Sequence, residues 1–265
     1  MYDFNYHRPT TLEAARKLFE QSEDGWYLAG GHTLLPSMKL RLAAPSDLID
    51  LSRIEDLTGI SATGDEVRIG ACTPHDTVAR SREVGRAIPA LCDLAAGIGD
   101  AQVRNRGTIG GSIANNDPAS DYPAGLVGLD AVVITDSRDV PADEFFTGMF
   151  ETVLEPGELI RSVRFPVPAA ACYVKFPNPA SRYATVGVMV ARTGDGVRVA
   201  VTGAGPCVFR DAAMESALSD NFHPAALDGC VVDADGLNDD MHASAAYRAH
   251  LCVVLTRKAV TRLTA

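Results

Sequence analysis

The stretch of sequence that decides the fold covers residues 102–124 and reads QVRNRGTIGGSIANNDPASDYPA. Its adjacent glycines, Gly110 and Gly111, lie between the hydroxyl residues Thr108 and Ser112. Glycine pairs occur in turns, and they also allow a backbone to approach a ligand closely. A concave set of backbone N–H groups and hydroxyls binds phosphate oxygens without any formal positive charge. The stretch is therefore typical of either a structural turn or a phosphate site.

An earlier stretch, YLAGGHTLLP at residues 27–36, repeats this chemistry. Its loop Ala29–Thr33 also holds two glycines next to a hydroxyl residue, and two such loops that converge could hold both halves of a pyrophosphate. Neither loop fits the G-x-x-x-x-G-K-[ST] motif or a G-x-G-x-x-G motif that opens a long helix. The two loops leave a nucleotide site of another architecture and a pair of ordinary turns as competing interpretations.

The composition limits the kinds of protein that the chain can be. Its 265 residues are 46% hydrophobic and 22% charged, which is typical of a globular protein with a substantial core. The formal net charge of −10 argues against nucleic acid or an anionic membrane as the main partner. No apolar run approaches the roughly 20 residues that span a bilayer, and we expect a cytoplasmic protein.

The cysteines and histidines are too dispersed to indicate a metal site. The six cysteines contain no C-x-x-C pair, and the six histidines contain no H-x-x-x-H or H-E-x-x-H motif. We therefore expect this chain to bind neither zinc nor an iron–sulfur cluster.

The N-terminal part mixes expected helices and strands. Elements expected from hydrophobic periodicity and from start and stop signals are a helix that begins at a capping box of Thr10 and Glu13, strands at 26–29, 46–51, 66–71, 131–135 and 159–165, and helices at 73–81, 84–98 and 122–129.

The pattern changes after Pro166 and Pro168, which oppose any continuing strand or helix. Alternating runs at 183–191 and 197–203 flank the turn sequence Thr-Gly-Asp-Gly, which predicts an antiparallel hairpin. A Leu- and Ala-rich helix at 243–263 closes the chain. The expected fold class is α+β in two parts.

The stretch at 102–124, together with AGGHTLLPSMKLRLAAPSDLIDL from Ala29 and PASRYATVGV from Pro179, resembles the FAD-binding medium subunit of the molybdenum hydroxylases. This family includes xanthine dehydrogenase and aerobic carbon monoxide dehydrogenase. The resemblance extends to YRAHLCVVLTRKA near the end of the chain and is closest to the separate-chain, carbon monoxide dehydrogenase type.

The resemblance implies a two-subdomain FAD-binding domain of the p-cresol methylhydroxylase-like type at residues 1–168, with subdomains at about 1–53 and 54–168. A smaller C-terminal domain at 169–265, an antiparallel sheet with helices, would follow.

The resemblance also implies a set of FAD-binding residues. The two glycine loops would wrap the pyrophosphate, Asp121 would contact FAD, Ile160 would pack against it, Lys175 would lie near it, and Tyr183 would lie against the isoalloxazine ring. The full set is Ala29, Gly30, Gly31, His32, Thr33, Thr108, Ile109, Gly110, Gly111, Ser112, Asp121, Ile160, Lys175 and Tyr183.

Several of these residues also have an ordinary structural interpretation. Without the family, His32 is typical of a turn, Asp121 could cap the helix that starts at Tyr122, and Tyr183 is typical of a half-buried sheet residue. Arg104 and Arg106 could neutralise phosphate, or they could have a solvated or interface role.

The function implied is that of an electron-transfer subunit with no catalytic residue and no metal of its own. A molybdopterin-binding large subunit and a 2Fe-2S small subunit would be its partners, in a dimer of heterotrimers, and the flavin would pass electrons from the clusters to a terminal acceptor. One alternative is a self-sufficient FAD-dependent oxidase of the p-cresol methylhydroxylase type, with flavin linked covalently to His32. Another is a flavin-free structural subunit.

Overall fold

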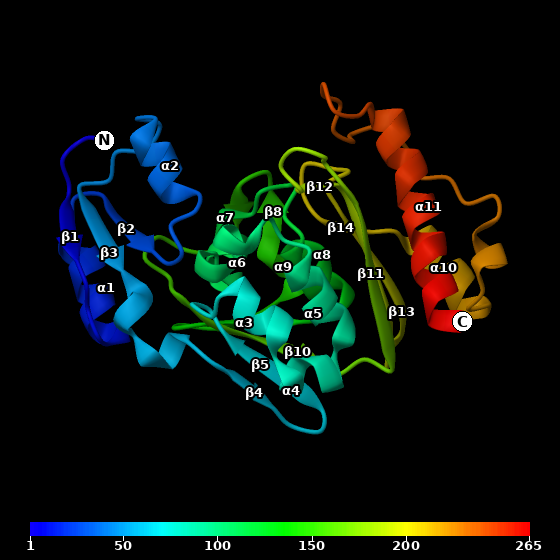
Figure 1. Ribbon diagram of the computed structural model, residues 1–265, viewed down its shortest axis with the longest axis horizontal. Coiled ribbons are helices and arrows are strands. Elements are labelled where there is room, and N and C mark those ends of the chain that lie inside the picture. The colour runs from blue at the N-terminus through cyan, green and yellow to red at the C-terminus, as the bar shows by residue number, and fades with distance from the viewer.

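The computed structural model describes residues 1–265 and contains three main sheets arranged in a row (Figure 1). The N-terminal sheet lies at one end, a five-stranded sheet with most of the helices lies in the middle, and a four-stranded sheet with the last helices lies at the other end. Each predicted segment, 1–53, 54–168 and 169–265, contributes one of these sheets, while the division into domains stays a prediction. No helix combines the length and the apolar character that crossing a membrane requires.

The N-terminal sheet is parallel, has the strand order β1-β3-β2, and packs against α1. Thr11, not Thr10, is the N-cap of α1, because its hydroxyl accepts a hydrogen bond from the N–H of Ala14. The predicted capping box of Thr10 and Glu13 is therefore wrong, because the third residue after this N-cap is Ala14, which cannot bond back. The elements are β1 (Asn5–His7), α1 (Leu12–Gln21), β2 (Gly25–Leu28), α2 (Leu34–Lys39) and β3 (Asp47–Asp50).

The middle sheet is antiparallel with the order β4-β5-β10-β6-β7, so a strand from late in the segment lies at its centre. Val163 of the central strand is paired with Ile69 on one side and Val133 on the other. These three side chains are fully buried beneath the helices. The strands are β4 (Ile60–Ala62), β5 (Glu66–Gly70), β6 (Val132–Thr135), β7 (Asp139–Pro141) and β10 (Ile160–Pro166), with a small hairpin of β8 (Phe146–Gly148) and β9 (Glu151–Thr152) and the short helices η1 (Leu51–Arg53) and η2 (Glu55–Leu57).

The helices of the middle part are shorter than the sequence predicts. The single helix expected at 84–98 is two helices, because Pro89 restricts the residue before it and Ile88 leaves the helical region with φ −139°. The helix expected at 73–81 begins at His75, after a Pro74 that gives no side-chain cap. The helices are α3 (His75–Arg80), α4 (Arg82–Ala87), α5 (Pro89–Ala96), α6 (Ala101–Arg106), α7 (Ile109–Asn115), α8 (Tyr122–Gly128) and α9 (Ala142–Phe145).

The C-terminal sheet confirms the predicted hairpin, with Thr193 paired to Gly196 at its turn. The alternation of buried and exposed residues expected along the first strand of this hairpin is wrong, because residues 184–191 are all buried. Helices α10 and α11 cover one face of the sheet, and α5 and α8 contact the other (Figure 1). The elements are β11 (Ala170–Pro177), which the sequence did not predict, β12 (Ala184–Thr193), β13 (Gly196–Thr202), β14 (Phe209–Arg210), α10 (Ala212–Asp220), η3 (Pro224–Leu227) and α11 (Ala245–Thr264).

Asn116 ends α7 in the left-handed conformation, with φ 41°. Its buried amide donates hydrogen bonds of 2.8 Å to the carbonyls of Gly148 and Glu151, one on each side of the turn between β8 and β9. One side chain therefore terminates the helix and holds the hairpin.

We expect Asn116→Ala to lower the free energy of unfolding by about 3 kcal/mol, because two hydrogen bonds from a buried amide are lost and alanine disfavours a left-handed backbone. Asn116→Gly loses the same hydrogen bonds but adopts this φ freely, and should cost about 1 kcal/mol less. Urea unfolding measures both. Equal stabilities of the two variants would show that the left-handed backbone costs nothing here.

Candidate functional site

A cavity of about 940 Å³ lies where the N-terminal sheet meets the middle part. This volume is near the upper end of the range of about 300–1,000 Å³ that is usual for ligand sites. Its walls come from the loop Ala29–Thr33, the start of α7, the start of β10, and residues 181–183 before β12. The cavity therefore joins all three parts of the chain.

The first glycine loop, which lines this cavity, carries a row of unbonded N–H donors. The N–H groups of Gly30, Gly31, His32 and Thr33 make no hydrogen bond within the chain. Gly31 has φ +73°, a conformation that places successive N–H groups on one concave side. Unsatisfied N–H groups in a cavity need partners, so this loop fits an anionic group such as a pyrophosphate.

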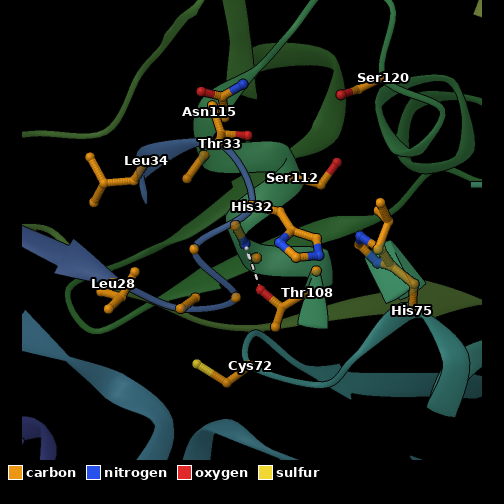
Figure 2. Close-up of a pocket in the computed structure, with 18 of the residues that line it drawn as sticks. Leu28, His32, Thr33, Leu34, Cys72, His75, Thr108, Ser112, Asn115 and Ser120 are labelled. Carbon is orange, nitrogen blue, oxygen red and sulfur yellow. Dashed lines mark hydrogen bonds between the residues drawn. The ribbon is translucent and has the colours of Figure 1, made fainter. Parts of the chain in front are cut away.

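The second glycine stretch is not a loop with free donors, contrary to the sequence interpretation. It forms the first turn of α7 with Thr108 as N-cap, and its N–H groups are already bonded within the chain. Ile109 donates to the carbonyl of Thr73, Gly110 donates to that of Ala71 at 2.8 Å, and Gly111 donates to the hydroxyl of Thr108 at 3.1 Å. The last of these bonds is the dashed line in Figure 2. This stretch contributes shape and hydroxyl groups instead.

Two of the glycines are required because another part of the chain packs closely against each of them. A Cβ on Gly30 would overlap the carbonyl of Arg106, and a Cβ on Gly110 would lie 2.6 Å from the Cβ of Ala71. Gly111 differs, because a Cβ there would lie 3.0 Å from the hydroxyl of Thr108 and otherwise meet only Ala29, at 3.8 Å. Gly30 and Gly110 thus permit close packing, and Gly111 leaves clearance beside the first loop.

Polar side chains without a partner also line the cavity around the two glycine stretches, which together we call the cradle. Figure 2 shows four of them, Thr33, Ser112, Asn115 and Ser120. The side chains of these four residues form no hydrogen bond within the chain. They can donate to or accept from a bound molecule in either direction, since hydroxyl and amide groups do both.

Asp121 is the centre of a buried polar cluster at one end of the cavity. It receives hydrogen bonds from the hydroxyl of Tyr173 at 2.5 Å and from the Nζ of Lys175 at 3.0 Å. It occupies the N-cap position of α8, but its side chain makes no capping hydrogen bond, so the capping interpretation is wrong. Burial raises the pKa of Asp121, while Lys175 and Tyr173 act in the opposite direction by favouring its charged form.

Lys175 lies behind the cavity wall and not on it. Its Nζ also donates to the carbonyls of Gly97, at 2.8 Å, and Arg182, at 3.0 Å. Arg182 has φ 63°, and it precedes Tyr183, whose side chain is 46% exposed at the cavity rim. Lys175 therefore ties the segment that carries Tyr183 to the middle part.

The structure brings most of the predicted residues together. Twelve of the fourteen line the cavity, the exceptions being Lys175 and Ile109, which is buried in the core. Arg104 and Arg106 do not line it, and Arg104 instead donates to the carbonyls of Ile98 and Gly99. Contact of each residue with a cofactor stays a prediction.

His75 is a lining residue that sequence reasoning missed. Its ring is turned toward that of His32 in Figure 2 and packs against Tyr122 with ring centroids 5.3 Å apart. Its Nδ1 is buried without a partner, and burial lowers its pKa to about 4. No local motif marks this histidine, because the backbone bond from its N–H to the carbonyl of Gly107 places it.

His32 bridges the first loop to α6. Its Nε2 lies 3.3 Å from the carbonyl oxygen of Gln102 and donates to it, since a carbonyl oxygen can only accept.

Fold and cavity together define a chain that holds one elongated, phosphate-bearing cofactor between its parts. Residues 2–168 match the FAD-binding domain of molybdopterin dehydrogenases. The chain is 35% identical to the carbon monoxide dehydrogenase medium chain of Hydrogenophaga pseudoflava, over 97% of this chain and 96% of the relative. It is 34% identical to the nicotine 6-hydroxylase medium subunit of Paenarthrobacter nicotinovorans, over 96% and 95%.

Solved structures agree with this match. A reconstituted CO dehydrogenase from Oligotropha carboxidovorans superimposes with a TM-score of 0.90 and 32% identity, covering 98% of this chain and 97% of the other. The chain belongs to the FAD-binding medium subunits of the molybdenum hydroxylase family. It binds FAD and is an oxidoreductase subunit, which confirms the family, fold class and cofactor predicted from the sequence.

We expect His75 to make the protein less stable in mild acid. Its pKa of about 4 in the folded chain lies below the ordinary 6.5, so the unfolded state binds the proton more readily. Its contribution of about 3 kcal/mol is complete above pH 6.5 and is lost as the pH falls toward 4.

The measurement is urea unfolding across this pH range, comparing the parent with His75→Gln and with His250→Gln, which changes an exposed histidine on α11. His75→Gln should make the free energy of unfolding depend less on pH, and His250→Gln should leave that pH dependence unchanged. A parent and a His75→Gln variant with the same slope would contradict the assignment.

Proposed function

We propose that this chain is the electron-transfer subunit of a molybdopterin-dependent hydroxylase or dehydrogenase, passing electrons from the 2Fe-2S clusters of a partner to a terminal acceptor. The observation that carries the proposal is the row of unbonded N–H groups at 30–33, in the wall of a cavity that Tyr183 also lines. Bound FAD supplies the redox chemistry, because it accepts single electrons and delivers pairs.

The chain's own residues bind and orient the cofactor. The N–H groups of the first loop hold the pyrophosphate, helped by the free hydroxyls of Thr33 and Ser112. Arg182 is the only lysine or arginine in the cavity wall, so neutral donors and not paired charges stabilise the phosphates.

The buried cluster around Asp121 fixes the other end of the cofactor. Lys175 donates to the carbonyl of Arg182, and this bond would position Tyr183 for contact with the isoalloxazine ring of bound FAD. Because Asp121 is engaged by Tyr173 and Lys175, it positions groups and has no role as an acid or base.

The relatives are medium chains or subunits, and from them we infer the partners of this chain. A molybdopterin-binding large subunit would oxidise the substrate, and a 2Fe-2S small subunit would deliver the electrons. Two such heterotrimers would form the complex.

We expect Gly111→Val to raise the Kd for FAD at least about tenfold, which corresponds to about 1.4 kcal/mol. The branched side chain would fill the clearance between Thr108 and Ala29, beside the pyrophosphate. Its backbone is helical, so the effect does not depend on a positive φ. Gly64→Val is the matched control, because a Cβ there meets nothing within 4 Å. Flavin titration measures both, and unchanged affinity in Gly111→Val would remove α7 from the cradle.

We expect the flavin to be non-covalent. Acid precipitation of the purified chain should leave a yellow supernatant, and His32→Ala should still purify with flavin. Flavin that stays with the precipitated parent, and is lost in His32→Ala, would favour the covalent oxidase.

We expect the chain expressed alone to be reduced by dithionite but to turn over neither purines, aldehydes nor carbon monoxide. Co-expressed with its partners, it should elute with both and reduce an acceptor only when flavin is present. Turnover of an organic substrate by the isolated chain would overturn the electron-transfer assignment.

A further inference from the structure

A second cavity, of about 480 Å³, adjoins the FAD cavity. Ser181 and Tyr183 line both cavities, so the tyrosine forms part of the wall between them. A molecule in the second cavity would therefore lie on the far side of the residue placed against the flavin ring.

Three large apolar side chains from two separate segments line this cavity while remaining exposed. Met149 is 52% exposed, Phe150 is 58% exposed, and Tyr183 is 46% exposed. Exposed apolar side chains that gather around a hollow mark a binding surface more often than chance scatter does. They offer flat and adaptable contact area to an aromatic ring.

The conformation of Phe150 adds a second observation. Its φ of 57° is an outlier for a bulky residue, and its N–H donates to the carbonyl of Asn116 at 3.1 Å. A strained backbone that keeps an aromatic ring in solvent brings no gain in packing, and such strain concentrates at functional sites.

The charges of the cavity select against anions. Asp117, Asp239 and Asp240 line it, together with His242 and a single cation, Arg248. The guanidinium of Arg248 is buried and already donates to Asp240 and to the carbonyls of Thr185 and Gly203. It has little capacity left for an anionic ligand.

The start of α11, next to the acidic residues, offers no anion site either. The carboxylate of Asp239 accepts from the N–H of Ala245, and the hydroxyl of Ser244 accepts from that of Tyr247. These N–H groups are satisfied within the chain. A dinucleotide, with its pyrophosphate, would meet carboxylates without a free donor to offset them.

We propose that the second cavity binds an uncharged, planar electron acceptor of the quinone class and excludes anionic acceptors such as pyridine dinucleotides. The proposal rests on the proposed function, since reduced FAD must be the donor. FADH2 gives two electrons and two protons to the quinone, which becomes the hydroquinone while FAD is regenerated. Phe150, Met149 and Tyr183 supply the contact surface, and the carboxylates supply the selectivity.

Equilibrium binding tests the contact surface without catalysis. In the assembled FAD-loaded complex, calorimetry gives the Kd for naphthoquinone. Phe150→Gly should weaken binding at least about fivefold, and glycine accepts the positive φ, so the backbone remains favourable. Val231→Ser, on an 83% exposed residue outside both cavities, should change nothing. An unchanged Kd in Phe150→Gly would overturn the site.

A matched pair of ligands tests the charge selection. Naphthoquinone sulfonate has the same ring with one negative charge, and it should bind the parent more weakly than naphthoquinone. The double variant Asp117→Asn, Asp239→Asn keeps a side-chain oxygen at each position to accept from the N–H groups of Ala119 and Ala245. It should reduce the ratio of the two Kd values at least about threefold. Equal binding of the two ligands by the parent would overturn the selection.

Flavin absorbance separates this proposal from the proposed function. Dithionite should bleach the complex, and anaerobic naphthoquinone should restore its colour more slowly in Phe150→Gly than in the parent or Val231→Ser. A complex without bleachable flavin would refute the electron-transfer function itself. Bleaching and recovery at equal rates in all three proteins would refute only the acceptor site.

Discussion

The contact between the backbone of Gly30 and the carbonyl of Arg106 is the constraint on which the site depends. It brings the end of the parallel sheet against the end of α6, so no side chain can intervene at residue 30. The free N–H row that follows is thereby held beside the first turn of α7. Gly110, which packs against Ala71, fixes the same helix to the middle sheet. Cofactor binding is therefore a consequence of how closely three backbones approach.

Asp121 plays the corresponding role toward the C-terminal sheet. Its two partners, Tyr173 and Lys175, both lie on β11 and face the same side of that strand. Lys175 extends the connection to Gly97 and Arg182, so one ammonium group joins the middle helices, the sheet and the segment before Tyr183. A buried pair of this kind adds little stability on balance, but losing one partner leaves the other charged and buried. The geometry of the cavity wall near Tyr183 is thus determined by charge complementarity.

The sequence predicts features that depend on neighbouring residues, and misses those that depend on distant ones. The turn of the β12–β13 hairpin and the two glycine stretches are local, and their positions follow from residue type. The break between α4 and α5 at Ile88 also follows from a neighbouring residue, because Pro89 restricts the residue before it. In contrast, the burial of β12 on both faces depends on α8 and α11, which no local pattern reveals. The free or bonded state of an N–H group, which separates the two glycine stretches, likewise depends on tertiary partners such as Ala71.

The central position of β10 in the middle sheet affects how the chain is made. β10 (residues 160–166) lies between β5 and β6 in the sheet but follows both in the chain. The edges of β5 and β6 that face β10 therefore have no partner until residues 160–166 have left the ribosome. Until then the nascent protein carries two unpaired strand edges, which invite association with other chains. The late strand closes the sheet and contributes Ile160 to the wall of the cavity, which residues 181–183 then extend. Flavin capture is consequently a late event in biogenesis, and the growing chain depends on protection until that moment.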